Sequence, residues 1–511
     1  MLATVQSSAV MGIDAYVVQV EIDIADGLPA FNTVGLPDSA VKESRERVAA
    51  AIKNSGYYFP TTRITANLAP ADVRKEGSAF DLPIALGVLT ATAQIRSGHF
   101  DQTLVLGELA LDGSIRSVRG CLPIAINAKE KGFTGAIIPK ANAKEAAIVD
   151  ELNVFPVESL QEAVQFLNGE RAIEPFKYDI WEAFRQHSEY MIDFVDVKGQ
   201  EHVKRAIEVA AAGGHNLIMI GPPGSGKTMI AKRIPTILPD MTLDEALETT
   251  KIHSIMGLLA DDVPLIATRS YRSPHHTISD AGLIGGGKFP HPGEVSLSHN
   301  GVLFLDELPE FRKNVLEVMR QPLEDGHVTI ARAAASYTYP ANFMLVSAMN
   351  PCPCGFFGDS TRDCRCSPQQ IQNYVSRISG PLLDRIDLQV EVPAVKYKDL
   401  SSDLTGEPSA DIRERVQTAR RIQQERFAQT TVYCNANMES KHLREYCKVE
   451  EDAQELLRVA ITQLGLSARA YDRILKVART IADLGNSPTI EGEHVSEAIQ
   501  YRSLDRSFWN R

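Results

Sequence analysis

The sequence lacks the features of a membrane-spanning or exported protein. None of its apolar stretches reaches the roughly 18 uncharged residues that a membrane-spanning helix needs. The N-terminal stretch MLATVQSSAVMGIDAYVVQV lacks both the basic start and the small-residue cleavage site of a secretory signal. We therefore expect a cytoplasmic protein that does not engage a membrane.

A basic excess is also missing, since 53 lysines and arginines face 65 aspartates and glutamates and the formal net charge is -12. This balance argues against a surface coated for nonspecific nucleic-acid binding, but it leaves room for a DNA channel lined by a few basic loops. The seven cysteines are unevenly placed in a chain of 511 residues. Such usage indicates thiols of a reducing compartment and not a disulfide framework.

The chain is too long for a single hydrophobic core, and its composition changes along its length. β-like runs from Ala15, Arg63 and Thr103 alternate with helical stretches at 41–52 and 81–93, without a glycine-rich phosphate loop. A polar segment, a second α/β block, a turn-rich connection at 397–410 and charged helical stretches at 411–427 and 453–484 follow. The expected parts are 1–168, a linker at 169–196, 197–395 with a cysteine loop at 352–366, and 396–511.

A glycine-rich loop joins an apolar strand, expected at residues 216–220, to a helix in the second α/β block. Its glycines let successive backbone N–H groups turn around a polyphosphate, and the helix start adds its positive dipole end. Lys227 is expected to reach the β and γ phosphates of ATP, and Thr228 to ligate Mg²⁺. The flanking strand and helix disfavour an ordinary glycine turn. The loop residues are Gly221, Pro222, Pro223, Gly224, Ser225, Gly226, Lys227 and Thr228.

Two carboxylates follow a second buried strand, GVLFLDE at residues 301–307. Asp306 is predicted to hold the Mg²⁺ shell, and Glu307 to orient and deprotonate the attacking water. The alternative is an acidic strand end that caps a helix, which the phosphate loop upstream disfavours. A third strand at 343–348 leads to Asn350, whose neutral polar side chain can position the same water.

The order of these elements resembles that of AAA+ ATPases, which carry a polar sensor at the place of Asn350. A motor of this class needs a cation from the neighbouring subunit to stabilise charge on the transferring phosphoryl group. Arg385 is the candidate for this role, and a surface ion pair with one of the nearby aspartates Asp384 and Asp387 is the alternative. Because such a cation acts between subunits, a ring is expected.

The C-terminal helical block offers a further arginine. In the segment SARAYDR, Arg469 is the candidate sensor that reports the nucleotide state from a helical lid, and Arg473 is the alternative. This arrangement again presupposes the AAA+ organisation that the upstream residues resemble.

Four longer segments resemble the ComM/YifB family, within the magnesium-chelatase-like AAA+ group, and the similarity spans essentially the whole chain. The segments are SPHHTIS at 273–279, GGG at 285–287, HPGEVSLSHNGV at 291–302 and RISGPLLDR at 377–385.

This resemblance implies a hexameric AAA+ P-loop core with a C-terminal helical lid. It also implies a helicase that drives branch migration of strand-invasion intermediates while incoming DNA is integrated during natural transformation. The implied partners are single-stranded, duplex or branched DNA, and recombination proteins. The segment VKGQ resembles the one that packs against adenine in this class, which implies nucleotide-binding roles for Val197, Gly199 and Gln200.

The residues at 328–337, VTIARAAASY, alternate as a β-hairpin does and lie just before the strand that leads to Asn350. Related helicases place a pore-facing hairpin here, so Arg332 is a candidate for contacting DNA phosphates. An exposed hairpin charge without a ligand is the alternative.

The N-terminal block resembles the proteolytic domain of Lon proteases in RKEGSAFD at 74–81 and in the glycine spacing up to IIPK at 137–140. Those enzymes use a serine nucleophile with a lysine base. Ala79 and Leu122 align with these two positions, and a register shift to Ser78 restores a nucleophile without its base. We therefore expect an α/β domain that is proteolytically inactive, with DNA binding or ring organisation as its remaining roles.

Two close cysteine pairs in a loop rich in glycine, aspartate and proline can supply four thiolates to a tetrahedral Zn²⁺. The one-residue gap within each pair is tighter than the usual gap of about two. Four reduced thiols in a loop are the alternative. The four are Cys352, Cys354, Cys364 and Cys366.

Two further functions share the same ATPase core. One is a chelatase-type motor that remodels a protein partner for metal insertion, and the other is an ATP-dependent protease or a regulator of ATP-dependent proteolysis. The Lon-like block and the cysteine loop match the ComM pattern and not the chelatase subunit, and the missing serine and lysine speak against proteolysis.

Overall fold

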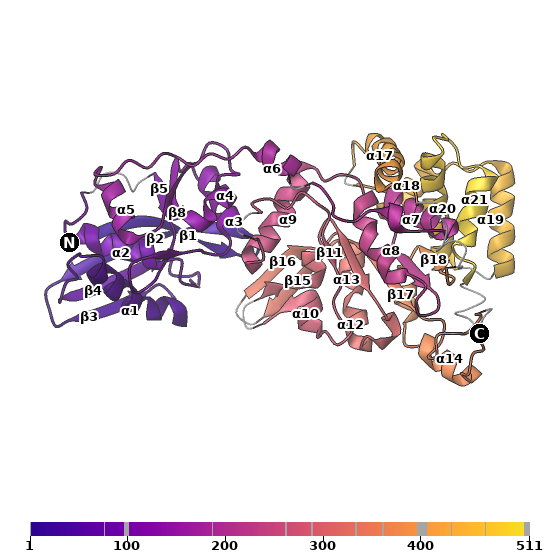
Figure 1. The fold of residues 1–511 in the computed structure, drawn as a ribbon, viewed down its shortest axis with the longest axis horizontal. Helices are drawn as coiled ribbons and strands as arrows, with labels where there is room; N and C mark the ends of the chain where they lie inside the picture. The colour runs from indigo at the N-terminus through magenta and orange to yellow at the C-terminus, as the bar shows by residue number, and fades with distance from the viewer. Residues whose placement is uncertain are drawn as a thin grey trace. The chain divides into compact units, whose positions relative to one another are not determined.

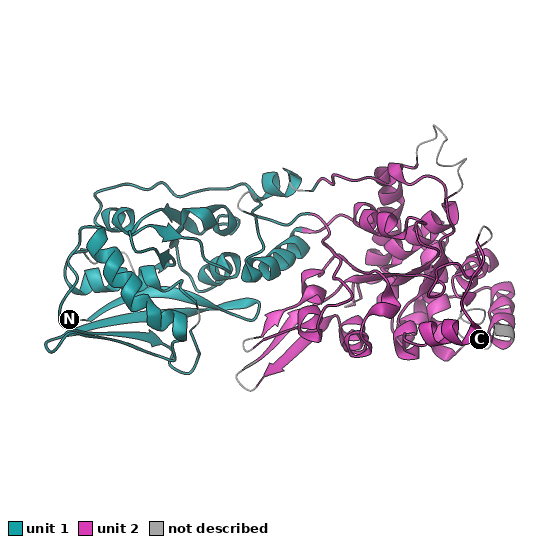
Figure 2. Ribbon diagram, turned by 60° about the horizontal axis from the view of Figure 1, so that its bottom comes forward, with its two compact units in different colours: residues 1–188, 243–267 teal, residues 189–242, 268–511 magenta. Residues whose placement is uncertain are grey.

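The computed structural model describes residues 2–504 except 76, 97–101, 187, 261–262, 288–289, 333–334, 360–361, 396–405, 431 and 465–466. The chain divides into two compact units (Figure 2). Unit 1 comprises Met1–Ser188 and Leu243–Ala267, and unit 2 comprises Glu189–Thr242 and Thr268–Arg511. The second segment of unit 1 thus comes from the middle of the chain. Most of the expected connection at 397–410 lies outside the described residues.

Unit 1 contains a seven-stranded mixed sheet in the order β3-β4-β2-β1-β5-β8-β9 (Figure 1). β2 pairs antiparallel with β1 and with β4, and the other neighbouring strands pair parallel. A small antiparallel pair, β6 and β7, lies outside this sheet. The strands are β1 Leu2–Met11, β2 Asp14–Ala25, β3 Ala30–Val34, β4 Arg63–Ala69, β5 Thr103–Val105, β6 Glu108–Leu109, β7 Ile115–Arg116, β8 Gly135–Pro139 and β9 Asn153–Val157.

Helices α1 to α5 of unit 1 contact this sheet, whereas α9 packs against α3. In α2, a Cβ on Gly87 would lie 2.6 Å from Cγ1 of Ile22, so glycine allows the helix to approach β2 closely. The predicted runs from Ala15 and Arg63 are confirmed as β2 and β4, whereas the run from Thr103 is divided between β5 and β6. The helices are α1 Ser39–Asn54, α2 Asp81–Ala91, α3 Cys121–Glu130, η1 Lys140–Asn142, α4 Ala143–Ala146, α5 Leu160–Leu167, α6 Ile180–Gln186 and α9 Leu243–Met256.

Unit 2 contains a five-stranded, wholly parallel sheet in the order β11-β14-β17-β10-β18. The three predicted strands at 216–220, 301–307 and 343–348 are confirmed as β10, β14 and β17. Because all five strands are parallel, their carboxyl ends lie at one edge of the sheet. The strands are β10 Leu217–Ile220, β11 Tyr271–Arg272, β14 Val302–Leu305, β17 Met344–Met349 and β18 Leu388–Glu391.

Two short antiparallel pairs accompany this sheet, β12 (Gly285–Gly286) with β13 (His291–Pro292), and β15 (His327–Arg332) with β16 (Ala335–Pro340). The helices around the sheet come from the first part of unit 2. They are η2 Phe194–Asp196, α7 Glu201–Gly213, α8 Lys227–Arg233, η3 Ile234–Ile237, α10 Asp280–Ile284, α11 Glu294–Leu297, η4 Leu308–Glu310, α12 Lys313–Val318, α13 Arg320–Asp325, α14 Pro368–Val375 and α15 Gly380–Leu383.

The C-terminal part of unit 2 is helical and shares one apolar core with the sheet, in which Phe427 and Ile474 join Leu217 and Val390. The predicted helical stretch 453–484 corresponds to two helices. Within the described part of the chain, no helix combines the length and apolar character that crossing a bilayer requires. The helices are α17 Ser409–Arg426, η5 Asn435–Asn437, α18 Ser440–Tyr446, α19 Glu451–Leu464, α20 Ala468–Leu484 and α21 Gly492–Gln500.

Candidate functional site

The glycine-rich loop at 221–228 follows β10 and leads into α8. Gly221 has no room for a side chain, because a Cβ there would lie 2.1 Å from the backbone oxygen of Val392. Gly224 and Gly226 have φ angles of +78° and +89°, in the left-handed region that favours glycine. The backbone path of the loop therefore depends on all three glycines.

The side chain of Lys227 is held inside this loop and is only 8% exposed. Its Nζ donates to the carbonyl oxygens of Gly221 at 2.7 Å and Pro222 at 2.9 Å, and lies 3.4 Å from Oδ1 of Asn350. Burial lowers the pKa of Lys227, and the charge of Asp306 opposes this shift. An anion bound in the loop would offset the desolvation of the ammonium group, so the site fits a phosphate.

Thr228 and Asp306 form the second contact of the site. The Thr228 hydroxyl donates to Oδ2 of Asp306 at 2.7 Å, and the Asp306 Oδ1 accepts the backbone N–H of Glu307 at 2.9 Å. Hydroxyl and carboxylate oxygens are ligands that Mg²⁺ prefers. The pair therefore fits a magnesium ion bound together with a phosphate at the same edge of the sheet.

Glu307 adopts a left-handed backbone conformation with φ +52°, which is uncommon for a residue other than glycine. Its Oε2 lies 3.4 Å from Nδ1 of His276, whose ring packs edge-on against Phe311 at a centroid distance of 6.4 Å. The sequence gives His276 only as part of the segment 273–279, without a role. The sequence feature that could have pointed to His276 is the pair of adjacent histidines, His275 and His276, shortly after β11.

The segment expected at the adenine contacts the phosphate loop. Gln200 has φ +56°, and its Nε2 donates to the carbonyl oxygens of Ser225 at 3.0 Å and Pro393 at 2.7 Å. Val197 is buried, and Gly199 is left-handed with φ +66°. The side chain of Gln200 thus connects this segment to the phosphate loop and to the end of β18.

Arg385 is buried, although the sequence places it as a cation for a neighbouring subunit. Its side chain is 9% exposed, its Nη1 donates to the carbonyl oxygen of Pro381 at 2.5 Å, and its Nη2 contacts Glu324. Within the described part of the chain, its buried Nε has no hydrogen-bond partner. Burial lowers the pKa of Arg385, Glu324 opposes this, and the charges of Arg320 and Arg469 lower it further.

The two aspartates considered as partners of Arg385 pair with other arginines. Asp384 accepts Nη1 of Arg469 at 3.2 Å, and Asp387 accepts Nη1 of Arg473 at 2.5 Å. The Arg469 side chain is 71% exposed, whereas that of Arg473 is largely covered. Arg473 therefore has a buried partner, and Arg469 is accessible beside Arg385.

Arg332 lies at the end of β15 in the predicted hairpin, whose residues 333–334 are outside the described part. Its side chain is exposed, and its Nη1 lies 3.3 Å from the carbonyl oxygen of Ala331. A Cβ on Gly285 would lie 2.6 Å from Cδ1 of Ile330, so the β12–β13 pair packs closely against the hairpin. The exposed side chain of Arg332 thus extends from a strand that packs against the β12–β13 pair.

The four cysteines of the loop come together, and we call them the cysteine cluster. Hydrogen bonds from backbone N–H groups, of which that of Phe356 contributes most, lower the pKa of the Cys354 thiol to about 6. One member is fully buried and three are half-buried. Four sulfurs this close match the donor set of a structural zinc site. Their Sγ atoms, from Cys352, Cys354, Cys364 and Cys366, all lie within 4.8 Å of one another.

Comparison with protein families matches three models of one subunit. The model "Magnesium chelatase, subunit ChlI" matches residues 193–400, "Subunit ChlI of Mg-chelatase" matches 20–142, and "Magnesium chelatase, subunit ChlI C-terminal" matches 406–502. Together they cover parts of both compact units.

Individual relatives match over different lengths. Competence protein ComM of Haemophilus influenzae is 46% identical over 99% of this chain and 98% of its own, and YifB of Escherichia coli is 44% identical over the same shares. The magnesium-chelatase 67 kDa subunit of Chlorobaculum parvum is 29% identical over only 32% of this chain and 24% of its own. The similarity to this 67 kDa subunit is therefore partial, whereas the similarity to ComM and YifB spans the chain.

Proposed function

The chain belongs to the ComM/YifB family of magnesium-chelatase-like AAA+ proteins, and from this premise we propose that it is an ATP-driven motor that moves on DNA. The observation that carries the proposal is the contact between three separate strand ends. Lys227, Asp306 and Asn350 follow β10, β14 and β17, and hydrogen bonds or close contacts connect them through Thr228 and the phosphate loop.

In the proposed site, Lys227 and the loop N–H groups bind the phosphates, and Thr228 with Asp306 holds Mg²⁺. ATP supplies the phosphoryl bond whose hydrolysis drives movement. Glu307 accepts a proton from the attacking water, and Asn350 orients that water. His276 positions the carboxylate of Glu307 through the contact between Nδ1 and Oε2.

The proposed load is DNA, on which the motor promotes branch migration of recombination intermediates as incoming DNA is integrated in natural transformation. Support comes from the full-length similarity to Competence protein ComM and from the exposed position of Arg332 on its hairpin. Single-stranded, duplex and branched DNA are the proposed partners, together with recombination proteins. The proposed setting is a homo-hexamer in the cytoplasm.

The remaining parts receive supporting roles in the proposal. The C-terminal helices act as a lid whose Arg469 responds to the nucleotide, and residues 1–168 form a Lon-like domain without proteolytic activity. In unit 1, Leu122 is fully buried, and Ser78 donates its hydroxyl to Glu108. The buried leucine at the position of the lysine base, and the hydrogen bond that directs the Ser78 hydroxyl to a carboxylate, support this inactivity.

The cysteine cluster is proposed to bind Zn²⁺, because its four sulfurs are already gathered in a loop that contains little secondary structure. A zinc ion would cross-link the two ends of this loop. The loop begins two residues after Asn350, so the cross-link would also restrain the strand end that carries this side chain.

The decisive experiment measures ATP hydrolysis and movement of a branched DNA substrate by the full chain. We expect hydrolysis to be stimulated by DNA, and Glu307→Gln to reduce it at least about 10²-fold, because the general base is lost. Lys227→Ala should abolish both activities, whereas Arg421→Ala, at an exposed position of α17, should change neither. Hydrolysis that no single-stranded, duplex or forked DNA stimulates would contradict a DNA motor.

A chelatase-type motor is the second candidate, because all three family models name the chelatase subunit. The low coverage of the chelatase relative weighs against it. ATP hydrolysis stimulated by a porphyrin-binding protein partner and not by DNA would favour this alternative over the DNA motor.

A further inference from the structure

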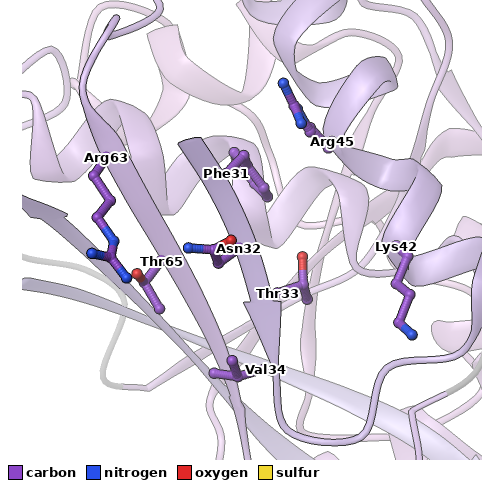
Figure 3. Close-up of a pocket in the computed structure, with 8 residues that line it drawn as sticks. All are labelled: Phe31, Asn32, Thr33, Val34, Lys42, Arg45, Arg63 and Thr65. Atoms are coloured by element: carbon purple, nitrogen blue, oxygen red, sulfur yellow. The ribbon is translucent and has the colours of Figure 1, made fainter. Parts of the chain in front are cut away.

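A hollow of about 510 Å³ in unit 1 lies along β3, the strand at one edge of the seven-stranded sheet. Figure 3 shows Lys42 and Arg45 on α1 at one side of β3, and Arg63 and Thr65 on β4 at the other. Asn32 of β3 lies between them. The hollow is thus built from three neighbouring elements that are well separated from the ATP site in sequence.

The side chains that line this hollow have the chemistry of an anion site. Three are cations, three are neutral hydrogen-bonding groups, and no lining residue is acidic, although the chain as a whole carries a net charge of -12. Among the described residues, no carboxylate forms an ion pair with Lys42 or Arg63. Nε of Arg45 lies 3.5 Å from Oε1 of Glu46, but both side chains are mostly exposed, so this ion pair neutralises little of the positive charge of the hollow.

A phosphodiester backbone fits this lining better than a peptide does. Phosphate and sugar groups are contacted by Arg and Lys together with Thr and Asn side chains, and these types make up six of the eight lining residues. A peptide strand added to β3 would need apolar pockets for alternate side chains, and only Phe31 and Val34 are apolar here. The edge strand is also short, with five residues.

We propose that this hollow binds the phosphodiester backbone of DNA, so that unit 1 contributes a second DNA contact, separate from Arg332. The inference rests on the proposal that the motor acts on DNA. The contact is independent of sequence and of the nucleotide site, and it positions the DNA without hydrolysing ATP.

The test uses the full chain in which Lys42, Arg45 and Arg63 are all changed to Gln, with Lys131→Gln as a matched exposed control in unit 1. Affinity for a labelled duplex is measured by fluorescence anisotropy over a range of salt concentrations. The triple variant should bind at least about tenfold more weakly, and its salt dependence should fall by about 2 to 3 in slope. Basal ATP hydrolysis and the melting temperature should stay unchanged.

Three outcomes would overturn the inference. If DNA stimulates hydrolysis but the triple variant binds DNA as the wild type does, the hollow is not a DNA contact and the proposed motor stands. If the wild type neither binds DNA nor responds to it, both proposals fail. If polyglutamate binds more tightly than DNA and loses affinity in the triple variant, the hollow recognises an acidic peptide.

Discussion

Two arginines of α20, Arg469 and Arg473, lie four residues apart and have different partners. Arg473 pairs with the buried Asp387, whose Oδ2 also lies 3.4 Å from Nδ1 of His215. Burial by itself would raise the pKa of Asp387, but the charge of Arg473, followed by the His215 contact, holds this pKa well below its ordinary value. Asp387 therefore favours the folded state at neutral pH, and this contribution is lost as the pH falls through its folded pKa.

We expect Arg473→Ala to lower the free energy of unfolding by about 3 kcal/mol at neutral pH, because it leaves a buried carboxylate without its main partner. The difference from wild type should shrink on acidification, since the variant can protonate Asp387 more easily. Thermal or denaturant unfolding at several pH values checks this. Arg469→Ala is the matched control, which should keep the stability and lose ATP hydrolysis; equal destabilisation by both changes would contradict the distinction.

At the residue scale, the phosphate loop could be predicted from its local sequence, but the contacts that distant residues make around the ATP site could not. Glycines at 221, 224 and 226 are visible along the sequence because the backbone of the loop demands them, and the polar residues after the strands because phosphate and Mg²⁺ chemistry needs them. The contact of His276 with Glu307, about 30 residues away, and the pairing of Arg385 with Glu324 depend on how distant segments pack. Such contacts have no signature in spacing.

At the scale of single elements, the β15–β16 hairpin is the part of unit 2 that we expect to contact DNA. Arg332→Ala should weaken binding to all DNA sequences alike and lower the salt slope by about 1, because one phosphate contact is lost. Basal hydrolysis should remain, while its stimulation by DNA decreases. Anisotropy and ATPase assays measure both, and Arg421→Ala serves as the control. A loss of basal hydrolysis would instead indicate a structural role for the hairpin.

The cysteine loop is the second element with a testable property. We expect one zinc ion for each chain in purified protein, and none after the four cysteines are changed to Ser, because all four sulfurs contribute to one tetrahedral site. Metal analysis measures this directly. Changing Cys121 to Ser provides a control outside the cluster that should retain zinc. Protein that contains no stoichiometric zinc before any change would exclude the site and favour four reduced thiols.

Helices and strands were predictable where one regular hydrophobic pattern ran through the whole element. Their assignment to a compact unit was not predictable, because it depends on tertiary packing. The buried strands β10, β14 and β17 follow from short apolar runs. The assignment of α9 to unit 1 does not follow from any local pattern. It depends on contacts such as Ser254 with Glu145, and the backbone N–H of Gly120, which donates to the Ser254 carbonyl at 3.1 Å.

At the scale of the whole molecule, the proposed ring requires Arg385 to act on the ATP site of a neighbouring subunit, although its side chain is buried in the single chain. In the single chain, Glu324 and the Pro381 carbonyl bind the guanidinium, yet its Nε has no hydrogen-bond partner among the residues that the structure describes. An anion presented by an adjacent subunit would compete with the Glu324 pair. A cation that acts between subunits makes each ATP site depend on two chains, which mixed assemblies can test.

We expect Lys227→Ala and Arg385→Ala proteins to be inactive separately and to recover ATP hydrolysis in co-purified mixed rings. The loop of an Arg385→Ala subunit next to the intact arginine of a Lys227→Ala subunit forms a complete site, and random mixing makes about one quarter of the sites complete. Mixing Lys227→Ala with the double variant creates no complete site and must stay inactive. If Arg385 acts within its own chain, mixed rings recover nothing, and the proposed division of the site between subunits is wrong.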